Sequence, residues 1–437
     1  MVSRPKASTR NPGTLGEWVK LVRGTTYKGY LVGKPGPVLL GLSSISPNGG
    51  FRRTNFETYG GDCAKNIVVN SGDIYVSLKD VTQSADLLGA VARLPKDISS
   101  GRLTQDTVRL IAIRKDTPWD YIYWLLRTPQ YRNFCSRYAT GTTTLGLGRD
   151  DFLGYPVPDF TDQRRFIVQA LQAIERRHEE LSFQSETLES LARAIFKSWF
   201  VDFDPVRAKA EGREPDGMDA ATAALFPCEL VPAEEGMMPA GWNEGVLEDV
   251  CEVAKIGVQK TDMRSDENYV GLEHIPRESW SLASWGTAEN LQSGKSRFQQ
   301  GDILFGKLRP YFHKVCIAPV DGVCSTDILV LRPKNPEWMA FALCLVSSKQ
   351  MIDYATRLSN GAKMPRSSWH DLSVYKAILP PESLAEAFNR IVEPIVGRII
   401  ANVYTAATLT ALRDTLLPRL ISGKLRVPEA EAILTEV

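Results

Sequence analysis

Three short stretches contain residue types that could act on a nucleotide or a phosphodiester, and each lacks something the chemistry needs. Ser293-Gly294-Lys295-Ser296 ends like a phosphate-binding loop, but a glutamate stands where the first glycine is required. Leu379-Pro380-Pro381-Glu382 holds the proline pair of an adenine-methylating motif with the wrong neighbours. Asp202, Asp204 and Lys209 have the types of a nuclease site, but they lie in an acidic stretch that is better interpreted as a solvated linker. The sequence therefore predicts no catalytic site.

Metal and thiol chemistry are not indicated either. The histidines are isolated from one another, at His178, His274, His313 and His370, so no metal site or triad can be argued. The seven cysteines include no C-x-x-C, which argues against zinc and is typical of a reducing compartment. We expect a cytoplasmic chain without a cofactor or metal of its own.

Charge is distributed unevenly along the chain, although its net charge is only +1. Residues 1–160 hold 21 Lys+Arg against 13 Asp+Glu, whereas residues 202–240 hold 3 against 9. A basic first part fits a polyanionic partner, and an acidic connector would stay away from it. The 437 residues are too many for one compact core and suggest two or three domains.

The element that would organise these domains is a long heptad pattern between Gln163 and Val201. Steps of four and three residues lead through Ile167, Leu171, Ile174, His178, Leu181, Ser185, Leu188, Ala192, Ile195 and Trp199, of which eight are apolar. A period of 3.5 kept over several heptads predicts a coiled-coil helix over 161–201, roughly 55–60 Å long. Charged residues between these positions are expected to be solvated: Arg164, Arg165, Glu175, Arg176, Glu179, Glu186, Glu189 and Arg193.

The same seam recurs 221 residues later. It passes through Phe388, Val392, Ile395, Ile399, Asn402, Ala406, Leu409, Arg413, Leu416 and Leu420, again with eight apolar positions, and predicts a helix over 381–425. We expect Pro394 to kink this helix. If the two helices pack antiparallel with full overlap, Ser185 faces Asn402, and a buried polar pair would fix the register.

Matches outside the helices favour an internal duplication. Gly72-Asp73-Ile74 has a counterpart in Gly301-Asp302-Ile303, and Tyr138-Ala139-Thr140 has one in Tyr354-Ala355-Thr356. The alternative is two ordinary long helices in one α-rich domain, which would leave these matches unexplained.

Each long helix follows a segment of mixed α and β character. Lobe 1, over 15–160, has short β-type runs and one expected helix near 119–138. Lobe 2, over 241–380, has expected strands near 303–305 and 328–331 and one expected helix near 338–354. The remaining segments are a disordered tail over 1–14, the acidic connector over 202–240, and a second tail over 426–437.

The order lobe, helix, connector, lobe, helix is similar to that of the specificity subunit of type I restriction-modification systems. Residues 195–206 (IFKSWFVDFDPV) resemble the central conserved region of that family. Gly241-Trp242 resembles the phrase that opens its recognition domains, and Gly301-Asp302-Ile303-Leu304-Phe305 a strand inside them. One departure is the Glu-Gln pair at the start of each family helix, which is Asp162-Gln163 in the first helix and absent from the second.

This resemblance implies an α+β fold: two mixed α/β target-recognition domains, related by pseudo-twofold duplication and separated by two long antiparallel coiled-coil helices. It implies a non-catalytic subunit that binds a bipartite, asymmetric site on double-stranded DNA and directs adenine methylation or cleavage by partners. The partners would be two methylation subunits and two restriction subunits, and these would bind S-adenosylmethionine, ATP and magnesium. No membrane association is expected.

Bases are read by Arg, Lys, Asn and Gln, while Lys, Arg and backbone amides hold phosphates. Under this resemblance the candidate DNA-binding residues of lobe 1 are Lys28, Tyr30, Arg52, Arg53 and Lys79. Those of lobe 2 are Lys260, Lys307, Arg309, Tyr311, Lys363 and Arg366. The glycine-rich segment 141–148 would either approach a phosphate backbone or form a plain loop.

A second class of function stays open, namely a non-catalytic coiled-coil scaffold whose two lobes bind protein or carbohydrate. Duplex binding with a bipartite footprint, in the presence of the methylation subunit, would discriminate between the two.

Overall fold

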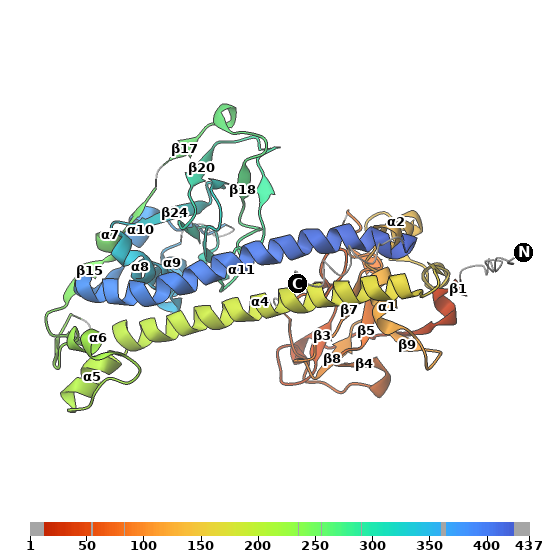
Figure 1. Cartoon of the computed structure of the whole chain (residues 1–437), viewed down its shortest axis with the longest axis horizontal. Helices are drawn as coiled ribbons and strands as arrows, with labels where there is room; N and C mark the ends of the chain where they lie inside the picture. The colour runs from red at the N-terminus through yellow and green to blue at the C-terminus, as the bar shows by residue number, and fades with distance from the viewer. Residues whose placement is uncertain are drawn as a thin grey trace, which may run out of the picture. The chain divides into compact units, whose positions relative to one another are not determined.

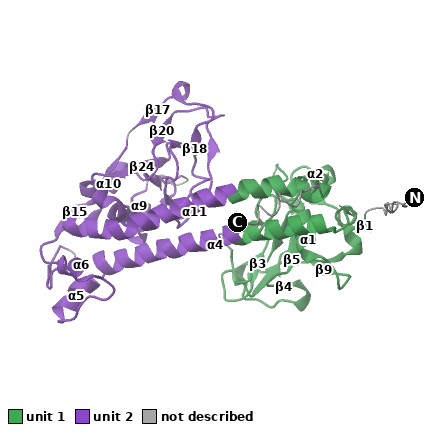
Figure 2. Cartoon of the chain, viewed as in Figure 1, with its two compact units in different colours: residues 1–176, 409–437 green, residues 177–408 purple. Residues whose placement is uncertain are grey.

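The computed structural model describes residues 13–53, 56–82, 84–234, 236–254, 256–289, 291–359 and 364–423. The chain divides into two compact units (Figure 2), with residues 1–176 and 409–437 in unit 1 and residues 177–408 in unit 2. Helices α4 (Asp162–Phe200) and α11 (Glu382–Ser422), both labelled in Figure 1, each begin in one unit and end in the other (Figure 2). Lobe 1 lies in unit 1, and lobe 2 lies in unit 2.

Lobe 1 contains two sheets with a core between them. The larger sheet is antiparallel and has the order β2 (Val19–Arg23), β9 (Thr107–Ala112), β5 (Ile74–Ser77), β7 (Val91–Arg93). The smaller sheet has the order β3 (Val38–Leu40), β8 (Ser100–Leu103), β4 (Val68–Asn70), with β3 parallel to β8. Side chains from both sheets, including Leu40, Val69, Tyr75 and Leu103, form one buried cluster.

Short elements complete lobe 1. They are η1 (Leu15–Glu17), η2 (Gly29–Leu31), η3 (Leu42–Ser44), η4 (Lys65–Ile67), β6 (Lys79–Asp80), β10 (Ala139–Thr140), β11 (Leu145–Leu147) and α3 (Arg149–Leu153). Gly13 and Thr14, expected in a disordered tail, instead form β1, which pairs with β12 (Pro156–Val157). A strand of two residues has too little alternation to be recognised in a sequence.

The helix expected over 119–138 is two helices, α1 (Trp119–Leu125) and α2 (Pro129–Arg137). The break has a local cause, because the Thr128 side chain accepts a hydrogen bond from the backbone N–H of Tyr131 and Pro129 occupies the first helical position. In lobe 2 the helix expected over 338–354 is likewise split into α8 (Met339–Val346) and α9 (Lys349–Leu358), and Ser348 caps the second part.

Lobe 2 also contains two main sheets. One is antiparallel, with the order β16 (Cys251–Val253), β24 (Ile328–Pro333), β21 (Ile303–Gly306), β22 (Val315–Ile317). The other has the order β17 (Gly257–Val258), β20 (Lys295–Phe298), β23 (Gly322–Cys324), β18 (Asn268–Val270), β19 (Gly286–Thr287), with β18 parallel to β23. Leu304, Cys316, Phe298 and Val270 share the core between them. The smaller elements are β15 (Asn243–Val246) paired with β25 (Lys376–Leu379), α7 (Leu247–Val250), η5 (Lys260–Asp262), η6 (Pro310–Phe312), η7 (Pro336–Trp338) and α10 (Trp369–Ser373).

The acidic connector is folded where the structure describes it. It contains α5 (Asp204–Ala210), α6 (Ala220–Ala224) and the hairpin β13 (Leu230–Pro232)–β14 (Met237–Pro239). Phe203 and Phe226 are buried with Trp199, Phe200 and Trp242 in an aromatic cluster of unit 2. The aromatic residues of the run 195–206 therefore join the end of α4 to the connector.

Within unit 2, α4 and α11 pack antiparallel. Asn402 Nδ2 donates to Ser185 Oγ at 3.1 Å, and the rings of Trp199 and Phe388 lie 5.8 Å apart. In unit 1, the Arg164 guanidinium donates to the carbonyls of Leu420 and Ile421 near the end of α11. All twenty predicted seam positions are buried or half-buried. Helix α11 continues through Pro394.

By length and composition alone, α11 is the one helix among the described residues that could cross a membrane, and the mean hydropathy of its most apolar window is 1.4. A helix that lines a packing seam has a similar composition, so this feature is weak evidence for a membrane span.

Candidate nucleic-acid interface

Three predicted cationic residues of lobe 2 meet on one short paired segment. The chain leaves β21 at Gly306, and Leu308 then forms an antiparallel bridge with Arg366. The N–H of Arg309 donates to the Pro365 carbonyl at 2.8 Å, and the N–H of Ser367 donates to the Lys307 carbonyl at 3.0 Å. Lys307, Arg309 and Arg366 are therefore brought together from two distant parts of the sequence.

A cleft of about 660 Å³ opens beside this segment. Its lining includes Lys307, Arg366, Ser368 and Trp369. Arg366 Nε lies 3.1 Å from Asp327 Oδ1 and is half-exposed, so part of its charge is offset inside the lobe. Lys307 and Arg366 therefore line the same cleft as the Trp369 indole.

The other two predicted cations of lobe 2 do not join this group in the described structure. Lys260 lies in η5, where its Nζ donates to Gln292 Oε1 at 2.9 Å, and it is not part of the cleft lining. Lys363 lies outside the described residues.

In lobe 1 the comparable position after β5 is occupied by Lys79. Lys79 pairs with Gly146 in the three-stranded sheet β10-β11-β6, so the middle strand of this sheet, which belongs to the glycine-rich segment 141–148, lies beside it. Its ammonium lies 3.1 Å from Asp106 Oδ1. Lys79 and the glycine-rich segment, which were predicted separately, are therefore neighbours.

The remaining candidates of lobe 1 differ in how accessible their side chains are to a ligand. The Tyr30 side chain is 69% exposed, with the Lys34 ammonium 5.9 Å from its ring centre, and Lys28 is exposed nearby. Arg52 is exposed, but Arg53 forms a two-bond ion pair with Asp97 at 2.7 and 3.1 Å. A phosphate would have to replace Asp97 before Arg53 could bind it, whereas Tyr30 is accessible as it stands.

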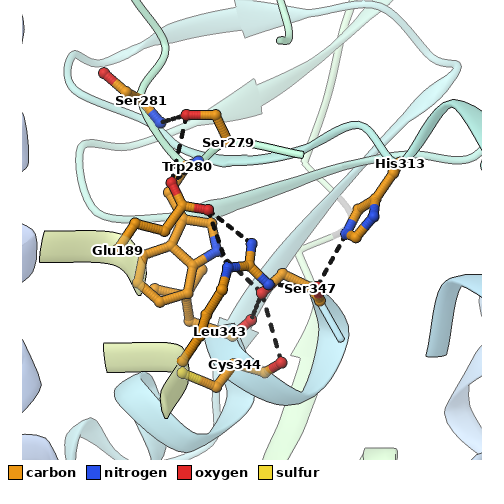
Figure 3. Close-up of polar contacts among 9 residues, drawn as sticks. Glu189, Ser279, Trp280, Ser281, His313, Leu343, Cys344 and Ser347 are labelled. Carbon is orange, nitrogen blue, oxygen red and sulfur yellow. Dashed lines mark hydrogen bonds and ion pairs between the residues drawn. The ribbon is translucent and has the colours of Figure 1, made fainter. Parts of the chain in front are cut away.

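Two glutamates of α4 link the long helix to the lobes, and the sequence did not identify them. Glu189 was expected to be solvated but is only 5% exposed. Its Oε2 accepts the backbone N–H of Trp280 at 2.8 Å (Figure 3). Its Oε1 accepts the Arg193 guanidinium at 2.8 and 3.0 Å. The Trp280 indole N–H in turn donates to Ser347 Oγ at 2.9 Å.

The Ser347 carbonyl continues this network to the strand side of lobe 2. It accepts Arg193 at 2.7 Å and lies 2.9 Å from His313 Nε2 (Figure 3). Burial lowers the pKa of His313, which favours the neutral ring; the hydrogen bond to the Ser347 carbonyl opposes that shift. A neutral ring can still donate from Nε2 in the matching tautomer.

In unit 1, Glu175 links α4 to lobe 1. Its Oε1 accepts Arg127 at 2.6 Å and the Tyr123 hydroxyl at 3.0 Å, both from the helical part of lobe 1. Burial raises the pKa of Tyr123, which keeps the phenol protonated as a donor. Glu175 and Glu189 stand two heptads apart, each directly after a seam residue. Their repeated position relative to the seam is the signal that could have indicated that both glutamates link α4 to a lobe.

Comparison with known proteins gives a consistent result. Residues 239–393 match the family described as type I restriction modification DNA specificity domain. The chain is 26% identical to the HindI specificity subunit of Haemophilus influenzae, over 70% of this chain and 77% of that protein. It is 24% identical to the MjaIX specificity subunit of Methanocaldococcus jannaschii, over 71% and 70%.

The fold is also similar to that of a solved specificity subunit, from the type I system of M. genitalium. That similarity has a TM-score of 0.51 at 15% identity and covers 95% of this chain and 98% of the other. These matches confirm the resemblance found in the sequence, to the specificity subunits of type I restriction-modification systems.

Proposed function

We propose that this chain recognises a bipartite, asymmetric site on double-stranded DNA, with one half-site per lobe, and directs adenine methylation or cleavage by partner subunits. The observation that carries the proposal is that both lobes share one framework, an antiparallel four-stranded sheet. When the strands are numbered by their order in the sequence, the strands of each sheet lie side by side in the order first, fourth, second, third. The lobes differ in the segment that follows the second strand.

One corner of the framework is repeated down to individual hydrogen bonds, which supports an internal duplication. Asp73 accepts the backbone N–H of Asn70 at 2.7 Å and pairs with Arg109 at 2.7 Å. Asp302 accepts the backbone N–H of Gln299 at 2.7 Å and pairs with Arg332 at 2.7 Å. Two copies of one DNA-reading fold are suited to a site with two parts.

The segment that differs between the lobes, together with the residues paired to it, carries the candidate cations. In lobe 1 it holds Lys79 and the glycine-rich segment, and in lobe 2 it holds Lys307, Arg309 and Arg366. Because base readout depends on which side chains reach the groove, two frameworks with unlike edges are expected to read unlike half-sites.

The long helices would act as a ruler between the half-sites. Helices α4 and α11 contain 39 and 41 residues and are continuous across the division between the units. A rigid spacer lets two reading lobes bind only half-sites with the matching separation and helical phase, as dimer geometry does in other DNA-binding proteins.

The catalytic chemistry would belong to partners. Two methylation subunits would dock on the helices and lobes and flip the target adenine into their own site, and two restriction subunits would add translocation and cleavage. S-adenosylmethionine, ATP and magnesium would then be bound by those subunits and not by this chain.

The proposal is tested by sequencing methylated adenines in a host with and without the gene. The expected result is one methylated sequence with two specified blocks separated by a fixed number of unspecified base pairs. A footprint of the complex with its methylation subunit on that duplex should show the same two blocks. If the complex binds no duplex at low salt, the proposal is wrong and the scaffold interpretation is favoured.

A further inference from the structure

The short turn between β21 and β22 has an unusual backbone. Arg309 and His313, which flank η6, both adopt the left-handed conformation, with φ of 51° and 50°. Side chains other than glycine seldom occupy this region, and such strain in native proteins is concentrated at functional sites. The lobe therefore holds this turn in a shape that its sequence does not favour.

Several contacts impose that shape. The N–H of Phe312 donates to the Arg309 carbonyl at 2.9 Å, and the N–H of His313 donates to the Pro310 carbonyl at 2.8 Å. Pro310 is buried, and the Arg277 guanidinium lies 4.1 Å from the centre of the Phe312 ring. Tyr311 is the residue left outside, with 50% of its side chain exposed. The turn thus presents one exposed aromatic ring, two residues along the chain from Arg309.

The turn is also connected to α4 by a chain of hydrogen bonds. His313 Nε2 lies 2.9 Å from the Ser347 carbonyl, which also accepts Arg193, and Arg193 is held by the buried carboxylate of Glu189 (Figure 3). All four residues belong to unit 2. The orientation of the turn is therefore set from the long helix as well as from the sheet.

The corresponding connection in lobe 1 is different. There the chain uses residues 78–90 between β5 and β7, whereas lobe 2 uses residues 307–314 between β21 and β22. The lobe 1 segment is held by Arg132, which donates to the carbonyls of Ala85, Asp86 and Leu88. Within matching frameworks, this connection is a place where the two lobes present different side chains.

We propose that Tyr311 is a specificity-determining residue of lobe 2, whose ring contacts the edge of a base in the half-site read by that lobe, and that His313 is its positioning residue. The inference rests on the proposed function. In duplex DNA the base faces are stacked on one another, so a side chain reads the base edges in the groove while cations hold the phosphates. An apolar ring can also select thymine by contact with its methyl group.

The test uses the complex of this chain with its methylation subunits and a duplex library in which each specified base pair is varied in turn. We expect Tyr311→Ala to lower methylation of the cognate duplex by about tenfold, the usual cost of losing the contact with one base pair. Preference should be lost at one or two adjacent positions of one half-site, while the other half-site is read as before. Tyr311→Phe, which keeps the ring, should stay within about twofold of the wild type.

His313 is tested by rescue. His313→Ala should weaken preference at the same positions as Tyr311→Ala, and His313→Gln, whose amide can donate to the Ser347 carbonyl, should restore it. Val374→Ala is the matched control, because Val374 is a lobe 2 side chain that is 48% exposed and lies outside the turn. Its base preferences should equal those of the wild type.

Two results would overturn the inference while leaving the proposed function intact. One is full base preference at every position in Tyr311→Ala, and the other is an equal fall at all positions of both half-sites. If the wild-type complex itself shows no two-block preference, the proposed function fails and this inference fails with it.

Discussion

Asn402 and Ser185 form a buried hydrogen bond of 3.1 Å between α11 and α4, within a seam that is otherwise mostly apolar. The Asn402 amide also donates to Gln184 Oε1 at 3.1 Å, and the Ser185 hydroxyl donates to the Leu181 carbonyl at 3.0 Å. Sliding one helix by one heptad would place Ser185 opposite Ile395 or Leu409, and Asn402 opposite Ala192 or His178, so the hydrogen bond between them would be lost. The pair therefore selects one alignment of the two helices.

Removing one member of this pair should be costly. We expect Asn402→Ala to lower the free energy of unfolding by about 1–3 kcal/mol, because the partner groups lose a buried hydrogen bond. Replacing both members, as Ser185→Ala with Asn402→Leu, should recover most of that loss, since no polar group is left unpaired. Denaturant unfolding of the two variants and the wild type measures this. A single variant as stable as the wild type would show that the pair does not contribute.

Glu189 should matter far more than its neighbours on the same helix. Glu189→Ala would leave the Arg193 guanidinium and the Trp280 N–H without their acceptor, and we expect a loss of about 3 kcal/mol. Glu186→Ala, at an exposed position of α4, should change stability by no more than about 0.5 kcal/mol. Thermal unfolding compares the two variants, and equal effects would argue against the network.

Salt dependence provides a test of the cationic edge of lobe 2. If Lys307 and Arg366 each neutralise one phosphate, the double variant Lys307→Gln/Arg366→Gln should reduce the slope of log affinity against log salt by about 1.8. Lys349→Gln is a suitable control, because Lys349 is exposed and pairs with Asp353 on the surface of α9. Binding of the complex to its duplex at several salt concentrations gives the slopes. An unchanged slope in the double variant would remove these two residues from the interface.

The ruler is tested by lengthening both helices. Seven residues inserted after Phe183 in α4 and after Val403 in α11 keep the seam in phase and add roughly 10.5 Å. The unspecified spacer should then grow by about three base pairs, at roughly 3.4 Å each. The same seven residues inserted after Gly212, in the connector, should leave the spacer unchanged. Sequencing of methylated adenines reads the spacer length directly, and lengthened helices with the old spacer would contradict the ruler.

His313 should make stability depend on pH. Its folded pKa lies below the ordinary value of 6.5 because burial disfavours the charged ring. Between those two pKa values the unfolded chain binds more protons, so stability is highest above pH 6.5 and falls as the pH drops through this window. His313→Gln should flatten that fall in denaturation experiments at pH 5–7. An equal fall in both proteins would assign it to other groups.

The pairing of the two long helices could be predicted from the sequence, because a heptad pattern specifies both a helix and the face of that helix that needs a partner. The same periodicity placed Ser185 opposite Asn402, and these residues are hydrogen-bonded. It could not show that Glu189 is buried, since a pattern records only the distance of a residue from the seam. Whether lobe 2 covers that flank is decided by tertiary packing.

Local breaks were missed for a similar reason. Thr128 and Ser348 cap the second helix of each lobe through their side chains, and both lie within apolar patterns that read as one continuous helix. The cations after β21 were identified individually by residue type, but their meeting with Arg366 depends on a pairing across nearly sixty residues of sequence. Residue type indicates which side chains can bind a phosphate, whereas only the fold decides which of them can bind the same one.

The outer surface of α11 has a practical consequence for handling the protein. The most apolar window of this helix is only 22% buried, and Ile391 and Tyr404 are 38% and 43% exposed. Exposed apolar side chains on a lone chain favour self-association. We therefore expect the isolated polypeptide to aggregate during purification, and yields to improve when it is produced together with a partner that covers these side chains.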